Sequence, residues 1–166
     1  MKKSLGIIVC FLIAMFLASG CGQNNKSGTY FNKKEGFSVE FPEGWKKIKT
    51  EFGMVVNYTD PEERIKVGIQ HQKLPSGKTL EETIKFLPGL FSQQGFKLID
   101  ESEAVIDGND AYWFRLILNT NIFSYYIVLK GQDCFAIIFS YDKDSTSEDA
   151  EDTIEGIVNS FRFMDK

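Results

Sequence analysis

The sequence predicts an α+β domain built on an antiparallel sheet, and three observations lead to this class. Several short segments alternate apolar and polar residues, which is the period of a half-buried strand. Two other segments, near residues 79–91 and 147–161, carry apolar residues at helical spacing. Three strand candidates in the C-terminal half follow one another with short turns, which is typical of an antiparallel meander.

Residues 1–20 have the order of a secretory signal peptide. Lys2 and Lys3 supply positive charge, residues 5–17 form an apolar run, and the small residues Ala18, Ser19 and Gly20 precede Cys21. The alternative is an uncleaved membrane anchor with an ordinary thiol at Cys21. Because the apolar run has thirteen residues, it is short of the roughly 20 that a membrane span needs.

The stretch from Leu17 to Cys21 resembles the lipobox of bacterial lipoproteins, with Ala18 at a position where leucine is commoner. The resemblance implies that the thiol of Cys21 is acylated and that the chain is cut before it. The protein is then lipid-anchored at the extracytoplasmic face of the cell membrane. Gly22 is not the aspartate that retains such proteins at the inner membrane of diderm bacteria, so an outer-membrane location stays open for such a host.

We predict three parts: a signal peptide at 1–20, a flexible tether at 21–28 and a folded domain at 29–166. The polar, small residues of the tether favour flexibility. The mature chain would carry 17 basic and 23 acidic residues, a balance that argues against a nucleic-acid partner. The same balance argues against electrostatic attachment to anionic lipid, which leaves the acyl chains as the anchor.

After export, Cys134 would be the single free thiol, because Cys10 leaves with the signal and Cys21 carries lipid. No intrachain disulfide can form, so the core must hold the domain by itself. The sequence has 15 phenylalanines, and burying one such side chain contributes about 1.5–3 kcal/mol. Cys134 lies in an apolar segment, which predicts an inert core thiol.

The predicted elements follow from local patterns. In the N-terminal half we expect strands at 30–34, 36–45, 53–59 and around 65–71. Thr79 and Glu82 form a capping box that opens a helix, and Pro88 should kink or end this helix near Phe86 and Leu87. Further strands are expected at 96–105, 110–119, 123–130 and 134–141, and the last of these is apolar on both faces. A closing helix capped near Ser147 carries an apolar stripe from Ile154 to Phe161.

This order of elements, with the stretch 36–45 near its start and the stretch 159–163 at its end, resembles the Mog1/PsbP-like superfamily. Leu74 and Pro75 and the capping box at 79–82 stand where that family begins its first helix. The resemblance implies an antiparallel sheet sandwiched by helices and a non-enzymatic role in binding or assembly. It implies no functional residues, because the family has no common site motif.

Patterns of reactive residues predict no catalytic residue, metal site or cofactor. The stretch 76–79 ends like a phosphate-binding loop, but Gln72 stands where that loop needs its first glycine. The acids from Asp142 lack the glycine and the bidentate acid of a calcium loop. His71 is the only histidine, and a structural or solvent-edge role is the expected one for it.

Aromatic residues cluster on two consecutive predicted strands, at 112–114 and 123–126. Most should enter the core, and those that stay exposed mark a partner or ligand surface, for which we single out Trp113, Tyr125 and Tyr126. We therefore expect a non-enzymatic module that binds an envelope protein, of unknown identity and oligomeric state. The alternative is a carrier of a small apolar ligand between sheet and helix. A hydrolase is the least favoured function.

Overall fold

The computed structural model describes residues 28–50, 53–144 and 149–164. The predicted signal peptide, the lipidation residue Cys21 and the helix cap at Ser147 lie outside these ranges. The predictions for them therefore rest on the sequence alone.

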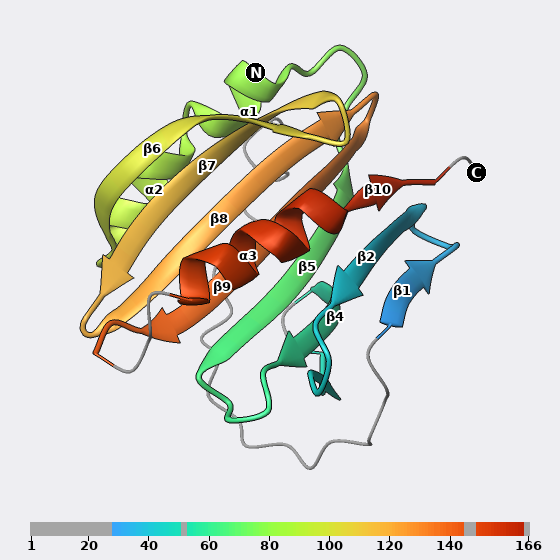
Figure 1. Ribbon diagram of the computed structural model, residues 1–166. Coiled ribbons are helices and arrows are strands. Elements are labelled where there is room, and N and C mark those ends of the chain that lie inside the picture. Colours follow the sequence, from blue (N-terminus) through green and yellow to red (C-terminus); the bar gives the residue numbers. More distant parts are fainter. Residues whose placement is uncertain (1–27, 51–52, 145–148, 165–166) are drawn as a thin grey trace.

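The described chain forms two antiparallel sheets (Figure 1). The larger one has seven strands in the order β3-β4-β5-β9-β8-β7-β6. Its strands are β3 (Lys46–Ile48), β4 (Met54–Thr59), β5 (Ile65–Lys73), β6 (Lys97–Ile106), β7 (Asn109–Leu118), β8 (Asn121–Lys130) and β9 (Asp133–Asp142). The smaller sheet has the order β1-β2-β10, with β1 (Gly28–Asn32), β2 (Phe37–Phe41) and β10 (Arg162–Phe163).

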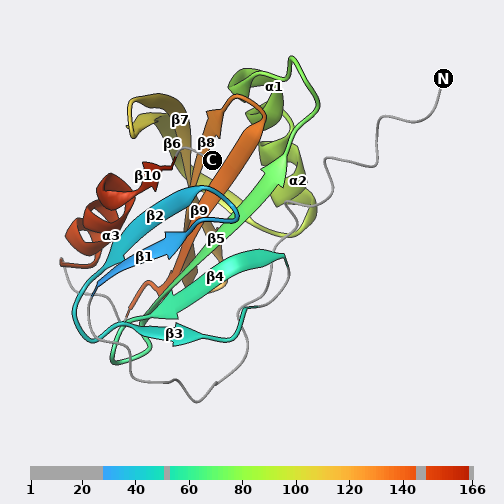
Figure 2. The same ribbon diagram turned by 90° about the vertical axis from the view of Figure 1, so that its right-hand side faces the viewer.

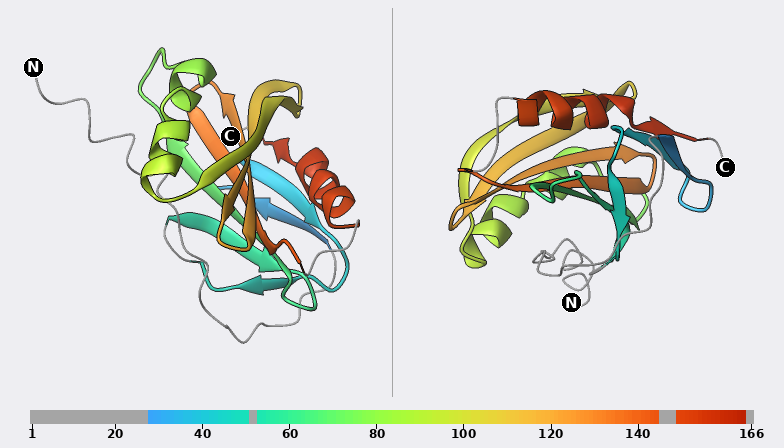
Figure 3. Two further views of the ribbon diagram at one scale, coloured as in Figure 1. Left: turned by 90° about the vertical axis from the view of Figure 1, so that its left-hand side faces the viewer. Right: turned by 60° about the horizontal axis from the view of Figure 1, so that its bottom comes forward.

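Both faces of the large sheet are covered, which confirms the predicted α+β fold with a sheet between helices. Helices α1 (Leu80–Ile84) and α2 (Leu87–Gln93) lie on one face, and α3 (Asp149–Ser160) lies on the other. Figure 3 shows the sheet between these layers, and Figure 2 shows the small sheet beside α3 on the same face. Each face has its own core of buried apolar side chains.

The meander β6–β9 is found within two residues of the predicted strands. Every residue of β9 from Cys134 to Tyr141 is buried, because alternate side chains enter the two cores. The apolar character of both faces of this segment therefore marks a strand near the middle of the sheet, as predicted.

The predicted strand at 36–45 is found as β2, and it belongs to the small sheet rather than to the large one. Phe37 stacks on Phe161 with ring centroids 5.4 Å apart, and it meets Phe135 of β9 edge-on at 5.4 Å. These rings join the small sheet to α3 and to the large sheet. The short strands β3 and β10 were not predicted, because two or three residues carry no readable alternation.

The helix signals at 79–91 are confirmed. Thr79 Oγ1 accepts a hydrogen bond from the Glu82 N–H at 3.1 Å, and the Thr79 N–H donates to Glu82 Oε2 at 3.4 Å. The stretch that ends like a phosphate loop is thus a turn with a helix cap. Pro88 stands in the first turn of α2, where its missing N–H costs nothing, so the apolar pattern is divided between two short helices.

Candidate functional site

A groove of about 490 Å³ lies between α3 and the outer strands of the large sheet. Strands β6, β7 and β8 form its floor and α3 forms one wall. The lining residues that matter below are Asp100, Ser102, Trp113, Arg115, Tyr126, Glu151 and Glu155. This volume is within the range of about 300–1,000 Å³ that small-molecule sites in proteins occupy.

Strand register aligns the floor of the groove. Ser102, Trp113 and Tyr126 are direct neighbours across β6, β7 and β8. Asp100 and Arg115 are paired in the next row on the same face. Because side chains two residues apart on a strand share a face, these rows present one continuous surface toward α3.

The centre of the floor is aromatic and carries one cation. The Trp113 and Tyr126 rings are tilted with centroids 6.2 Å apart, and Arg115 Cζ lies 5.1 Å from the Trp113 ring. Burial raises the pKa of Tyr126 to about 12, and the nearby Glu155 carboxylate acts in the same direction. Tyr126 is therefore neutral, so its hydroxyl serves as a hydrogen-bonding group rather than as a base.

The charges of the groove are mainly negative. Arg115 Nη2 donates to Glu151 Oε1 at 2.5 Å, which links the floor to the wall at α3. Asp100 and Glu155 add two further carboxylates to the lining. One guanidinium therefore faces three carboxylates, and the groove favours a neutral or cationic ligand over an anionic one.

Two hydrogen-bond donors in this groove have no acceptor. Among the described residues, three buried side-chain polar atoms lack a partner, and two of them are Trp113 Nε1 and Arg115 Nε. A buried donor without an acceptor costs about 1–3 kcal/mol, so folded proteins generally avoid it. Two such atoms on neighbouring side chains single out this groove as the place where the fold leaves hydrogen bonds to be made.

The structure separates the three aromatic residues predicted to form a surface. Trp113 and Tyr126 line the groove, whereas Tyr125 is only 3% exposed and packs in the core beneath α2. A surface role for Tyr125 is excluded by that burial. The sequence analysis missed Arg115 and Glu151. Alternation along β7 places Arg115 beside Trp113, but no local signal brings α3 and its Glu151 over the same strands.

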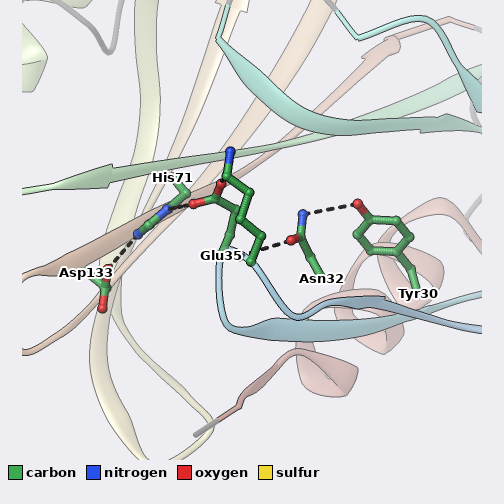
Figure 4. Close-up of polar contacts among 6 residues, drawn as sticks. Tyr30, Asn32, Glu35, His71 and Asp133 are labelled. Carbon is green, nitrogen blue, oxygen red and sulfur yellow. Dashed lines mark hydrogen bonds and ion pairs between the residues drawn. The ribbon is translucent and has the colours of Figure 1, made fainter. Parts of the chain in front are cut away.

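His71 occupies a different polar site, at the junction between the two sheets (Figure 4). Its Nδ1 lies 2.6 Å from Glu35 Oε2, in the turn between β1 and β2, and its Nε2 lies 2.8 Å from Asp133 Oδ1 at the start of β9. The ring also stacks on Phe135 at 4.4 Å. The hydrogen bond from His71 lowers the pKa of Glu35 below its usual value.

This arrangement makes His71 a structural residue rather than a catalytic one. Carboxylates only accept hydrogen bonds, so the ring satisfies both when each nitrogen carries hydrogen. A general base needs a free nitrogen directed at a nucleophile, and both nitrogens of His71 are engaged. In the part of the chain that the structure describes, no group of three or more His, Cys, Asp or Glu side chains could hold a metal ion.

Cys134 lies in the core between β9 and α2, as an inert thiol should. It is fully buried, and burial raises its pKa to about 12. The thiolate, which is the reactive form, is therefore not populated at neutral pH.

Comparisons with known proteins agree with this fold. Residues 26–163 match the PsbP family model. The solution structure of cyanobacterial PsbP (CyanoP) from Synechocystis sp. PCC 6803 is similar with a TM-score of 0.66 and 17% identity, covering 89% of this chain and 98% of that one. A crystal structure from Bacteroides thetaiotaomicron is similar with a TM-score of 0.55 and 14% identity. That match covers 78% of this chain but only 46% of the Bacteroides chain. A search of curated proteins found no match.

Proposed function

Because the chain belongs to the PsbP family, we propose that it is a non-enzymatic accessory module of the cell envelope, held at the membrane by lipid on Cys21. It acts by docking an envelope protein in the groove between α3 and strands β6–β8. The family suggests an accessory role, the N-terminal residues suggest the anchor, and the two unpartnered donors support the choice of docking surface.

The lipid anchor is supported by the order of charge, apolar run, small residues and cysteine at the N-terminus. Among the described residues, no helix is long and apolar enough to cross a membrane. Radiolabelled palmitate should enter the protein in its host and should not enter the Cys21→Ser variant. Absence of label from the parent protein, together with membrane pelleting of the variant, would refute the anchor.

The docking surface rests on the Trp113 and Arg115 donors. A partner's backbone carbonyls are suitable acceptors, since every residue of a peptide carries one. Glu151 is 60% exposed at its side chain, so its contact with Arg115 is a weak one. A rotation of Arg115 that breaks this contact and moves the guanidinium off the Trp113 ring can turn the guanidinium toward a bound peptide.

The same lining does not favour a carrier of apolar ligands. Three carboxylates and a guanidinium would lose hydration against such a ligand without gaining partners. An aromatic floor with polar walls is instead typical of protein interfaces, in which tyrosine, tryptophan and arginine are enriched. The geometry therefore supports a protein partner better than a lipid-like cargo.

Site-specific photo-crosslinking in the host tests the docking proposal. A photoreactive residue at Ser102, in the groove, should give an adduct with an envelope protein. The same residue at Glu62, an exposed position in the turn after β4, should not give this adduct. The proposal fails if both positions capture the same proteins, or if Ser102 captures none.

A matched pair of variants sharpens this test. Trp113→Phe keeps an aromatic ring but removes the indole donor, and it should reduce the Ser102 adduct severalfold. Tyr112→Phe changes the neighbouring residue on the opposite face of β7 and should leave the adduct unchanged. Equal effects of the two substitutions would assign the adduct to general packing rather than to the groove.

A further inference from the structure

Charge is distributed unevenly along this acidic chain. Residues 28–50 carry five lysines and three glutamates, whereas residues 97–118 carry five acidic and two basic residues. Helix α3 adds four acidic residues and no basic one. Although the whole sequence has a net charge of −4, the segment next to the predicted anchor is therefore basic.

The fold places the lysines of β3 and the acids of β6 at opposite edges of the large sheet, whereas α3 packs against β2. Strands β3 and β6 are the two edges of the seven-stranded sheet. Lys46 and Lys47 lie on β3, and Lys47 Nζ lies 5.4 Å from the Tyr30 ring of β1, so the β1–β2 hairpin and the β3 edge adjoin. Figure 2 shows β3 and β1 on the side away from β6 and β7.

We call this region the basic edge, defined by Lys33, Lys34, Lys46, Lys47 and Lys49. All of these lysines except Lys46 are exposed, and the Lys34 side chain is 90% exposed. Of the three glutamates in the segment, Glu35 is engaged by His71 and Lys34, whereas Glu40 and Glu43 are exposed. Phe31, on the same hairpin, is 61% exposed, and an aromatic ring beside lysines is typical of surfaces that meet a membrane interface.

The tether keeps this end of the domain close to any membrane that holds Cys21. Gly28, the first residue of β1, follows Cys21 by seven residues. At about 3.6 Å per residue, a fully extended tether spans about 25 Å. Electrostatic attraction to an anionic surface decays over about 8 Å at physiological salt, so it acts only on lysines that the tether allows to approach the headgroups.

From these observations we propose that the basic edge rests on anionic lipid headgroups. The acidic hairpin β6–β7, at the opposite edge of the large sheet, is repelled by the same surface, so the groove beside it is directed away from the membrane. This inference rests on the lipid anchor of the proposed function and adds an orientation to it. Electrostatics do not attach the protein here; they orient a protein that its acyl chains already hold.

Lysine footprinting on vesicles tests the orientation. The mature chain is coupled through Cys21 to a maleimide lipid, and Cys134 does not compete because it is fully buried. The vesicles are phosphatidylcholine alone or phosphatidylcholine mixed with phosphatidylglycerol, and lysines are acetylated and read by mass spectrometry. On the anionic vesicles, acetylation of Lys34, Lys47 and Lys49 should slow by roughly threefold or more. Lys78 and Lys97, near α1 and on β6, should react as they do on neutral vesicles.

Charge-reversal variants provide the control. The triple variant Lys33→Glu, Lys34→Glu, Lys47→Glu should lose the protection of Lys49. The triple variant Lys78→Glu, Lys85→Glu, Lys97→Glu makes the same change in net charge and should keep Lys49 protected. Equal protection of all lysines, or stronger protection of Lys97, would overturn the orientation. Because the maleimide supplies the anchor, this result is independent of whether palmitate enters Cys21 in the host.

Discussion

The His71 site and the α3 groove are both polar sites beside a core, but they differ in how their hydrogen-bonding groups are satisfied. At His71, both ring nitrogens contact carboxylates and the ring stacks on Phe135. In the groove, Trp113 Nε1 and Arg115 Nε are buried without an acceptor. The first arrangement is complete within the chain, and the second is not.

This difference separates a structural site from a candidate binding site. A satisfied network holds its elements together, and here it joins the β1–β2 turn to β5 and β9. An unsatisfied pair of donors adds nothing to stability until an acceptor arrives. Loss of His71 should therefore lower stability and leave partner binding intact. Loss of a donor in the groove should weaken partner binding and leave stability nearly unchanged.

The largest effect on stability is expected from His71→Leu. The substitution leaves Glu35 and Asp133 without the donor between them, and these carboxylates are mostly covered, with side-chain exposures of 21% and 26%. Losing such a partner should lower the free energy of unfolding by about 2–3 kcal/mol. Urea denaturation followed by tryptophan fluorescence measures it, and the Ser102 crosslink should persist in the folded variant. If the variant is as stable as the parent, His71 has no structural role.

Acid pH should weaken the His71 site through Glu35. Because the His71 hydrogen bond lowers the pKa of Glu35 in the folded state, this contribution is present above the usual glutamate pKa of 4.5 and is lost as pH falls through the folded value. Glu35→Gln should therefore lose less stability than the parent between roughly pH 5 and pH 3. Parallel denaturation curves over that range decide the matter. Identical pH profiles would show that the His71 hydrogen bond does not stabilise the ionised form of Glu35.

Trp113→Phe should show the reverse behaviour at the groove. It removes a donor that has no acceptor, which offsets the apolar area lost with the smaller ring, so the stability change should stay within about 1 kcal/mol. The same urea measurement tests this, alongside the predicted loss of the Ser102 adduct. A loss of stability as large as that of His71→Leu would assign Trp113 to the core.

The smallest effect is expected from Glu151→Gln. The pair with Arg115 is short, but Glu151 is 60% exposed, so the change in unfolding free energy should be at most about 0.5 kcal/mol. If Arg115 turns toward a partner, the substitution should leave the Ser102 adduct unchanged or increase it. A decrease of the adduct at unchanged stability would show instead that Glu151 itself contacts the partner.

Local patterns predicted most of the fold. The alternation in β2 and β5, the continuous apolar run of β9, the capping box at Thr79 and the proline in α2 each act over a few residues and are therefore visible in the sequence. The separate small sheet was not predicted. Its β10 strand has two residues, and its position depends on Phe37 packing against Phe161, which lies far along the chain.

The candidate site was predicted in part, for the same reason. Aromatic clustering pointed to Trp113 and Tyr126, but alternation alone could not tell which face of β8 remains open, so Tyr125 was included as well. Helix α2 covers one face of β8 and buries Tyr125, whereas α3 covers the other face only in part and leaves Tyr126 in the groove. His71 lacked any sequence signal for its partners, since Glu35 and Asp133 lie 36 and 62 residues away.

The sequence alone determined the α+β class, the order of most elements, the predicted export and lipidation signal, and the acidic overall charge, because each depends on composition or on neighbouring residues. Only the tertiary structure decided that β3 and β6 are opposite edges of one sheet. It also decided that His71 closes a network between sheets and that α3 leaves two donors unpaired over β7. These features arise from contacts between segments distant in the chain, and no local pattern encodes a contact whose two sides are so far apart.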